Sequence, residues 1–141
     1  MKFKMKNYPD LGLLVIRLIL GLGYIFVHGA PKLFAGPERW AKVGSAVSYL
    51  GINFSFTIWG LLAACAEFFG GILLLLGLFF RPAAAFLIIT MLVAANRGYA
   101  TAGTLSSVAY PLEMGITILG LFLIGPGKYS LDKYLFRGRQ I

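Results

Sequence analysis

Charged side chains lie inside or at the ends of long apolar segments, where charge is costly. Arg17, Glu67 and Glu113 each interrupt an apolar run. His28 and Lys32 follow the end of the first run. Insertion scales give a cost of about 2.5 to 3.5 kcal/mol for one charge at the centre of a membrane helix. Each group therefore needs a partner, a neutral form or a wet cavity, and together they form a candidate site for ligand binding or proton transfer.

The spacing of these residues predicts a pairing between the first two apolar segments. Arg17, Gly21, Tyr24 and His28 lie at i, i+4, i+7 and i+11, which places them on one face of a helix. In the second segment Glu67 is centred in a face of small residues, namely Gly60, Ala63, Ala64, Gly70 and Gly71. Small residues let a neighbouring helix approach closely. We therefore expect an ion pair between Arg17 and Glu67 near mid-depth, with Glu67 as the candidate proton carrier.

A second polar group is expected nearer the membrane surface. His28, Lys32, Arg97 and Glu113 fall at similar depths when the apolar segments are aligned. We expect Glu113 to pair with Arg97, His28 or Lys32.

A structural explanation of these charges stays open beside the functional one. Buried polar pairs can fix helix register without any catalytic role, and His28 alone is typical of a hydrogen-bonded helix end. Cys65 is the single cysteine, so an internal disulfide is impossible, and we interpret it as a small buried apolar residue. One histidine without neighbouring ligands does not indicate a metal site, and no metal is expected.

Composition requires that membrane helices position these groups. Of the 141 residues, 59% are hydrophobic and 13% are charged, whereas soluble domains average about 25% charged residues. We expect an all-α fold with one domain over residues 1–141, an integral membrane four-helix bundle. A short amphipathic surface helix around Trp40 should lie between the first two helices. The expected helices cover residues 11–30, 57–80, 82–99 and 108–124, with a tight turn at residues 80–82. The third is short for a membrane, so either snorkelling arginines or a helix that extends past Arg97 should make up the difference.

The distribution of basic residues predicts the orientation. With four spans, both termini and the turn at Arg81 share one side, which carries eight basic residues: Lys2, Lys4, Lys6, Arg81, Lys128, Lys133, Arg137 and Arg139. The other side carries four: Lys32, Arg39, Lys42 and Arg97. The positive-inside rule then places both termini in the cytoplasm. The net charge of +8 flanks membrane segments and forms no continuous basic face, which argues against nucleic acid as a partner. We expect the first helix to be retained and not cleaved as a signal peptide.

Five stretches resemble the DoxX family of small bacterial membrane proteins. They are Arg17 with its Leu-rich helix, HGAPKLF at 28–34, EFFGG at 67–71 followed by LLLLG at 73–77, Arg81-Pro82, and GPGKYSLD at 125–132. The resemblance implies a multi-pass protein of the bacterial inner membrane. It also implies a role as a subunit associated with an oxidoreductase that passes electrons to membrane quinone. The positions that it marks are Arg17, His28, Lys32, Glu67 and Glu113.

Three functions follow as alternatives. The first is a redox-associated membrane subunit without an intrinsic cofactor, which binds a quinone or similar small molecule at the Arg/Glu/His cluster and takes electrons from an external donor. The second is a non-catalytic anchor or assembly factor for a partner oxidoreductase, docked through the Trp40 helix and the basic tail. The third is a small transporter or lipid-binding protein. A protein partner and a homodimer remain alternatives, and the lipid bilayer is the expected environment.

Overall fold

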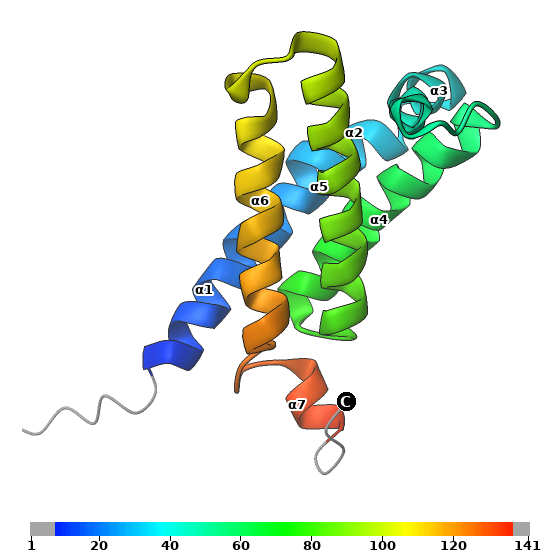
Figure 1. Cartoon of the computed structure of the whole chain (residues 1–141). Coiled ribbons are helices and arrows are strands. Elements are labelled where there is room, and N and C mark those ends of the chain that lie inside the picture. The colour runs from blue at the N-terminus through cyan, green and yellow to red at the C-terminus, as the bar shows by residue number, and fades with distance from the viewer. Residues whose placement is uncertain (1–7, 137–141) are drawn as a thin grey trace, which may run out of the picture.

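The computed structural model describes residues 8–136, and within them the chain is helical with no strand. Its elements are α1 (Tyr8–Leu22), the π-helical η2 (Gly23–Gly29), α2 (Ala30–Leu33), α3 (Pro37–Gly44), the 3₁₀-helical η3 (Ser45–Leu50), α4 (Phe56–Leu76), α5 (Phe80–Ala102), α6 (Leu105–Ile124) and α7 (Leu131–Leu135) (Figure 1). Within this part of the chain, four helical stretches are long and apolar enough to cross a membrane: Tyr8–Leu33, Phe56–Leu76, Phe80–Ala102 and Leu105–Ile124. The predicted membrane protein with four spans is confirmed.

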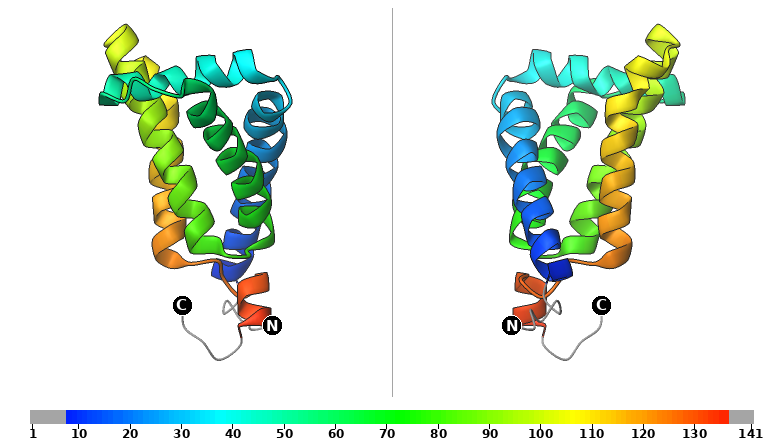
Figure 2. Two further views of the ribbon diagram at one scale, coloured as in Figure 1. Left: turned by 90° about the vertical axis from the view of Figure 1, so that its right-hand side faces the viewer. Right: turned by 90° about the vertical axis from the view of Figure 1, so that its left-hand side faces the viewer.

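The four spans form a wedge. The span made of α1, η2 and α2 packs along α4, α5 packs along α6, and α4 joins the two pairs through α5. Figure 2 shows that the pairs converge at the end near α7 and diverge toward α3, which crosses the wide end. The apolar core lies toward the narrow end, where Tyr24, Leu74, Phe80, Leu87 and Ile118 are fully buried. The wide end is therefore the place where the helices leave room for a ligand.

The turn between the second and third spans comes earlier than predicted. α4 ends at Leu76, and Gly77 follows in the left-handed region with φ +64°. Phe79 also has a positive φ, and Arg81 and Pro82 lie in the first turn of α5. The expected turn at residues 80–82 is therefore wrong. Glycine at 77 ends the helix because it adopts a left-handed cap without steric cost, and proline is well tolerated in a first turn.

The third span is longer than its apolar run. α5 continues to Ala102, so the helix extends past Arg97, which is one of the two predicted alternatives. Its 23 residues span about 35 Å at 1.5 Å per residue, enough to cross a hydrocarbon core of about 30 Å. The fourth span begins at Leu105, a turn before the predicted start.

The surface helix packs against α4 backbone to backbone. α3 begins with Pro37 after Gly36, and η3 continues it to Leu50, as the spacing from Trp40 predicted. A Cβ at Gly60 would lie 1.7 Å from the Trp40 carbonyl oxygen. Glycine at 60 therefore lets the backbones of α3 and α4 touch where the helices cross. This contact holds α3 across the wide end of the wedge, and α3 with η3 is called the roof.

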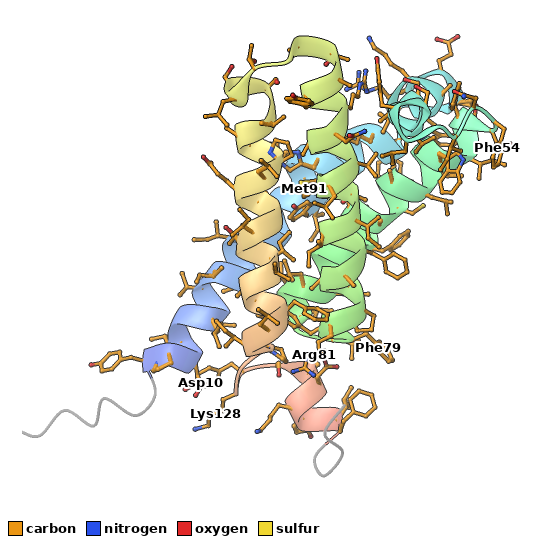
Figure 3. The ribbon with its side chains drawn as sticks, in the orientation of Figure 1. Asp10, Phe54, Phe79, Arg81, Met91 and Lys128 are labelled. Carbon is orange, nitrogen blue, oxygen red and sulfur yellow. The ribbon has the colours of Figure 1, made fainter. Side chains whose placement is uncertain are left out.

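Side chains from α1 and α7 cap the narrow end. An Asp10 carboxylate oxygen accepts from the backbone N–H of Lys128 at 2.8 Å, and the two residues lie together at the base of the molecule (Figure 3). The Asp132 carboxylate accepts from the N–H groups of Phe79 and Phe80 at 2.8 and 2.9 Å, which caps α5. The described start of α1, the connection between α4 and α5, and α7 share this end of the molecule (Figure 1), as the predicted topology requires. Five basic residues of that topology lie outside the described residues: Lys2, Lys4, Lys6, Arg137 and Arg139.

Candidate functional site

An ion pair between the first two spans lies toward the wide end of the wedge. Lys32 Nζ donates to Glu67 Oε1 and Oε2 at 2.8 and 2.6 Å. Glu67 is 3% exposed, while Lys32 is partly exposed. The predicted face of small residues positions this carboxylate, since Gly60, Ala64, Gly70 and Gly71 on the same helix are also buried. A buried carboxylate is costly unless it is paired and hydrogen-bonded, and Lys32 meets that requirement from the neighbouring helix.

Arg17 does not pair with Glu67, so that expectation is wrong. Its guanidinium instead donates to four backbone carbonyls: Leu74 at 3.1 Å, Leu75 at 3.0 Å, Pro126 at 2.6 Å and Tyr129 at 3.0 Å. Two of these belong to the last turn of α4 and two to the connection between α6 and α7. The last carbonyls of a helix lack intrahelical donors, and a guanidinium with five donors matches several of them at once. Arg17 therefore joins the helices at the narrow end, away from Glu67.

The π-helical segment η2 explains why Lys32 reaches Glu67. Arg17, Gly21 and Tyr24 face α4 as predicted, but η2 then inserts extra backbone into the turn. Gly29 takes the position against α4, where an added Cβ would lie 2.5 Å from Phe68 Cα. The π turn carries His28 away from this face, and α2 places Lys32 beside Glu67. π turns inside α-helices are found often at functional sites.

His28 contacts the fourth span. Its Nε2 lies 2.5 Å from the Tyr110 hydroxyl on α6, in a hydrogen bond whose direction depends on the tautomer. The Tyr24 ring lies 5.7 Å from the His28 ring, centroid to centroid. Within residues 8–136, the Tyr24 hydroxyl is the buried side-chain polar atom that has no hydrogen-bond partner. The ring contacts of His28 with both tyrosines and its hydrogen bond join Tyr24, His28 and Tyr110 in one polar cluster.

Glu113 and Arg97 do not join this cluster. Glu113 is exposed on α6, and within the described part of the chain it has no ion pair with Arg97, His28 or Lys32. The expected pairing is therefore wrong. Arg97 on α5 instead donates to the Lys42 carbonyl of α3 at 3.4 Å. Alignment by depth gives the position of each residue along its span but not the direction of its side chain. Arg97 contacts α3, whereas Glu113 is exposed on α6.

A cavity of about 960 Å³ lies between α4 and α5, beneath α3 and η3. Its wall is mostly apolar, with side chains that include Leu73, Phe69, Phe86, Ile89 and Val93. Glu67 and Lys32 line it, and so do Arg39, Lys42 and Arg97. The cavity thus combines an apolar body with a buried ion pair and a basic end.

Several residues of the cavity wall and of the polar cluster were not candidates from the sequence. Arg39 and Lys42 counted only toward the membrane topology, although their spacing of three places them on one face of a surface helix. Tyr110 gave no signal, because an exposed tyrosine near a helix start is common. Cys65 is partly exposed and lines the cavity, where the sequence predicted a buried apolar role. Within the described residues, no three His, Cys, Asp or Glu side chains come together as metal ligands.

The sequence matches a known family of membrane proteins. A family model described as DoxX matches residues 12–103, which is more than half of the chain and runs from α1 through α5. The match contains Arg17, His28, Lys32, Glu67 and Arg97, while Glu113 and the stretch 125–132 lie beyond it. Comparison with curated proteins and with solved structures gave no match.

Proposed function

Because the chain belongs to the DoxX family, we propose that it is a membrane subunit that binds a quinone or a similar small amphiphile beside Glu67 and Lys32. The family resemblance implies redox chemistry in partnership with an oxidoreductase. The observation that carries the proposal is a buried carboxylate, held by an ammonium group, in the wall of a mostly apolar cavity. An ionisable pair inside a membrane span points to function by default.

The size and lining of the cavity are those of a small-molecule site and support a quinone as its ligand. Small-molecule sites enclose about 300 to 1,000 Å³ with apolar walls and few polar groups, and this cavity has about 960 Å³. Phe69 and Phe86 offer aromatic surface for a ring. A membrane-dissolved ligand can enter between α4 and α5 without crossing water.

Lys32 and Glu67 have different roles in the proposed quinone site. A bound quinone supplies the electron-accepting group, and the electrons come from an external donor. The Lys32 ammonium is placed to donate a hydrogen bond to a quinone carbonyl oxygen. Reduction of a quinone to a quinol consumes two electrons and two protons, and Glu67 is placed to relay these protons to the quinone oxygens. The apolar wall excludes water, which strengthens both polar contacts.

Extraction of bound small molecules tests the proposal. The full chain is purified in mild detergent from membranes that contain quinone, and the organic extract is measured by mass spectrometry. Wild type should carry near-stoichiometric quinone, which Glu67→Gln should lose. The variant Lys32→Gln/Glu67→Gln keeps a neutral hydrogen-bonded pair and therefore separates loss of charge from loss of fold. Glu113→Gln is the matched control, because Glu113 lies outside the cavity and should leave the quinone content unchanged. An equal quinone content in wild type and Glu67→Gln contradicts the proposal.

One observation favours a second candidate, a non-catalytic anchor for a partner protein. Glu113 is exposed near the middle of a span (Leu105–Ile124), where a charge facing lipid is costly. A neighbouring membrane helix with a hydrogen-bond donor would relieve that cost. The anchor function predicts that Glu113→Leu abolishes co-purification of a partner oxidoreductase. It also predicts that Glu67→Gln leaves this co-purification unchanged.

A further inference from the structure

No acidic side chain among residues 8–136 lines the basic end of the cavity, and Glu38 of α3 lies outside the lining. Glu67 is the acidic side chain that lines the cavity in residues 8–136, and Lys32 neutralises it. Arg39, Lys42 and Arg97 add three further positive charges to the same lining. A cavity that is apolar along its length and positive at one end complements a molecule with an apolar tail and an anionic head.

The three cations come together at the roof of the wedge. Arg39 and Lys42 lie one turn apart on α3, so their side chains leave the helix on one face. Arg97 reaches the roof from α5, where its Nη1 donates to the Lys42 carbonyl. This contact fixes the guanidinium at the mouth of the cavity and leaves other N–H groups for a ligand, since a guanidinium has five. Together Arg39, Lys42 and Arg97 form the cationic rim.

The roof also connects the rim to the apolar body. Val43, Ala46 and Val47 of α3 and η3 line the cavity beneath the rim. α3 lies across the wide end of the wedge near the ends of the first two spans, while α5 and α6 extend beyond it (Figure 2). The ends of membrane spans correspond to the bilayer interface, where lipid phosphates lie above acyl chains. A lipid of that leaflet can therefore place its phosphate at the rim and a chain between α4 and α5.

We infer that the cationic rim and the cavity below it bind an anionic phospholipid, with the phosphate at Arg39, Lys42 and Arg97 and an acyl chain against α4 and α5. Guanidinium groups bind phosphate oxygens in a bidentate manner, and a rim without acidic side chains disfavours the quaternary amine of a zwitterionic headgroup. This inference does not rest on the proposed redox function, because it uses the rim and not the Lys32–Glu67 pair.

Lipid titration of the full chain tests the headgroup. Quinone-free protein in detergent is titrated with dioleoyl phosphatidylglycerol, with dioleoyl phosphatidylcholine or with inorganic phosphate alone, and bound lipid is counted by native mass spectrometry. Wild type should prefer phosphatidylglycerol. Each rim cation removed should weaken that binding about five-fold, so Arg39→Gln/Arg97→Gln should weaken it about 25-fold. The single variant Arg39→Gln, at an exposed position of α3, should weaken it about five-fold without touching the contact between α5 and α3.

Two control variants make the outcome decisive. Lys128→Gln/Lys133→Gln removes the same charge at the narrow end and should bind like wild type. Val93→Trp fills the cavity and should reduce lipid binding, whereas Leu92→Trp, at a position that is exposed and not part of the lining, should not.

Three results would overturn the inference. The first is equal affinity for phosphatidylglycerol and phosphatidylcholine. The second is a loss of affinity in the narrow-end control equal to that in the rim variant. The third is an affinity for inorganic phosphate equal to that for phosphatidylglycerol, with phosphate displacing the lipid. The last result would leave an anion site without a lipid. Glu67→Gln should keep the lipid preference, so failure of this inference and failure of quinone binding appear in different variants.

Discussion

Replacing Arg17 by methionine should strongly destabilise the protein, because this residue joins three parts of the chain at the narrow end. Its side chain is 1% exposed and donates to carbonyls from the end of α4 and from the connection between α6 and α7. Methionine fills a similar volume but offers no donor. The change therefore tests the hydrogen bonds more than the packing.

The size of the effect follows from the carbonyls that lose their donor. The Leu74 carbonyl still accepts from Gly77 N–H at 3.2 Å. The carbonyls of Leu75, Pro126 and Tyr129 lose the guanidinium without replacement. These three hydrogen bonds are partly buried and have a charged donor. Each such bond contributes about 1.5 to 3 kcal/mol, and relief from burying the guanidinium offsets part of the sum. We expect Arg17→Met to lower the free energy of unfolding by about 3 to 6 kcal/mol. Arg17→Lys, with three donors on a point charge, should lose about half as much.

Equilibrium unfolding in mixed detergent and SDS micelles, followed by far-ultraviolet circular dichroism, measures these differences. Ile19→Met is the matched control, since Ile19 lies on the same helix with its side chain exposed, and it should unfold like wild type. If Arg17→Met unfolds within about 1 kcal/mol of wild type, below the cost of one unsatisfied carbonyl, the assignment of Arg17 to structural support is refuted. If Arg17→Lys loses bound ligand but keeps the stability of wild type, the structural role of Arg17 is also refuted. That result would favour the hypothesis, drawn from the sequence, that Arg17 contacts a ligand.

Three further substitutions probe neighbouring features in the same unfolding assay. Gly77→Ala should cost at least about 1 to 3 kcal/mol from its left-handed backbone alone, and its Cβ would also lie 2.6 Å from Arg17 Nη2; wild-type stability would show that the turn relaxes freely. Asp132→Asn should lose about 1 kcal/mol, because the amide has one acceptor oxygen for the two N–H groups that the carboxylate caps; a stability equal to that of wild type would exclude a capping role. Tyr24→Phe should be neutral or slightly stabilising, because the hydroxyl is buried and has no partner among the described residues; a loss above about 1 kcal/mol would show that the hydroxyl is hydrogen-bonded in the membrane.

The fold could be predicted because lipid imposes it on the sequence. Apolar runs of span length fix the helices, and the short turns between the later spans make neighbours antiparallel. The ends of the helices were harder to predict from the sequence. Arg81-Pro82 resembles a turn, yet Gly77 ends α4 four residues earlier, since a left-handed cap depends on backbone geometry that composition does not show.

The buried position of Glu67 could be predicted from the sequence, but its partner could not. Glu67 was correctly placed on a buried face of small residues, and a cationic partner was required on physical grounds. The partner is Lys32 and not Arg17, because η2 adds backbone between Tyr24 and the end of the span. Helical phase counted at 3.6 residues per turn fails beyond such a π turn. The carbonyls that bind Arg17 come from turns, which carry no side-chain signal at all.

The two ends of the wedge differ in how they are held, and this difference has a functional consequence. At the narrow end, backbone carbonyls converge on the buried side chain of Arg17, and backbone N–H groups converge on the partly exposed carboxylate of Asp132. At the wide end, α3 packs on α4 through Gly60, and the Lys32–Glu67 ion pair connects the first span to α4. Arg17 and Asp132 each hold several backbone groups at once, whereas the Lys32–Glu67 pair is a single side-chain contact that can exchange a partner for a ligand oxygen. Motion that admits a ligand should therefore occur at the wide end, with the narrow end as its fixed point.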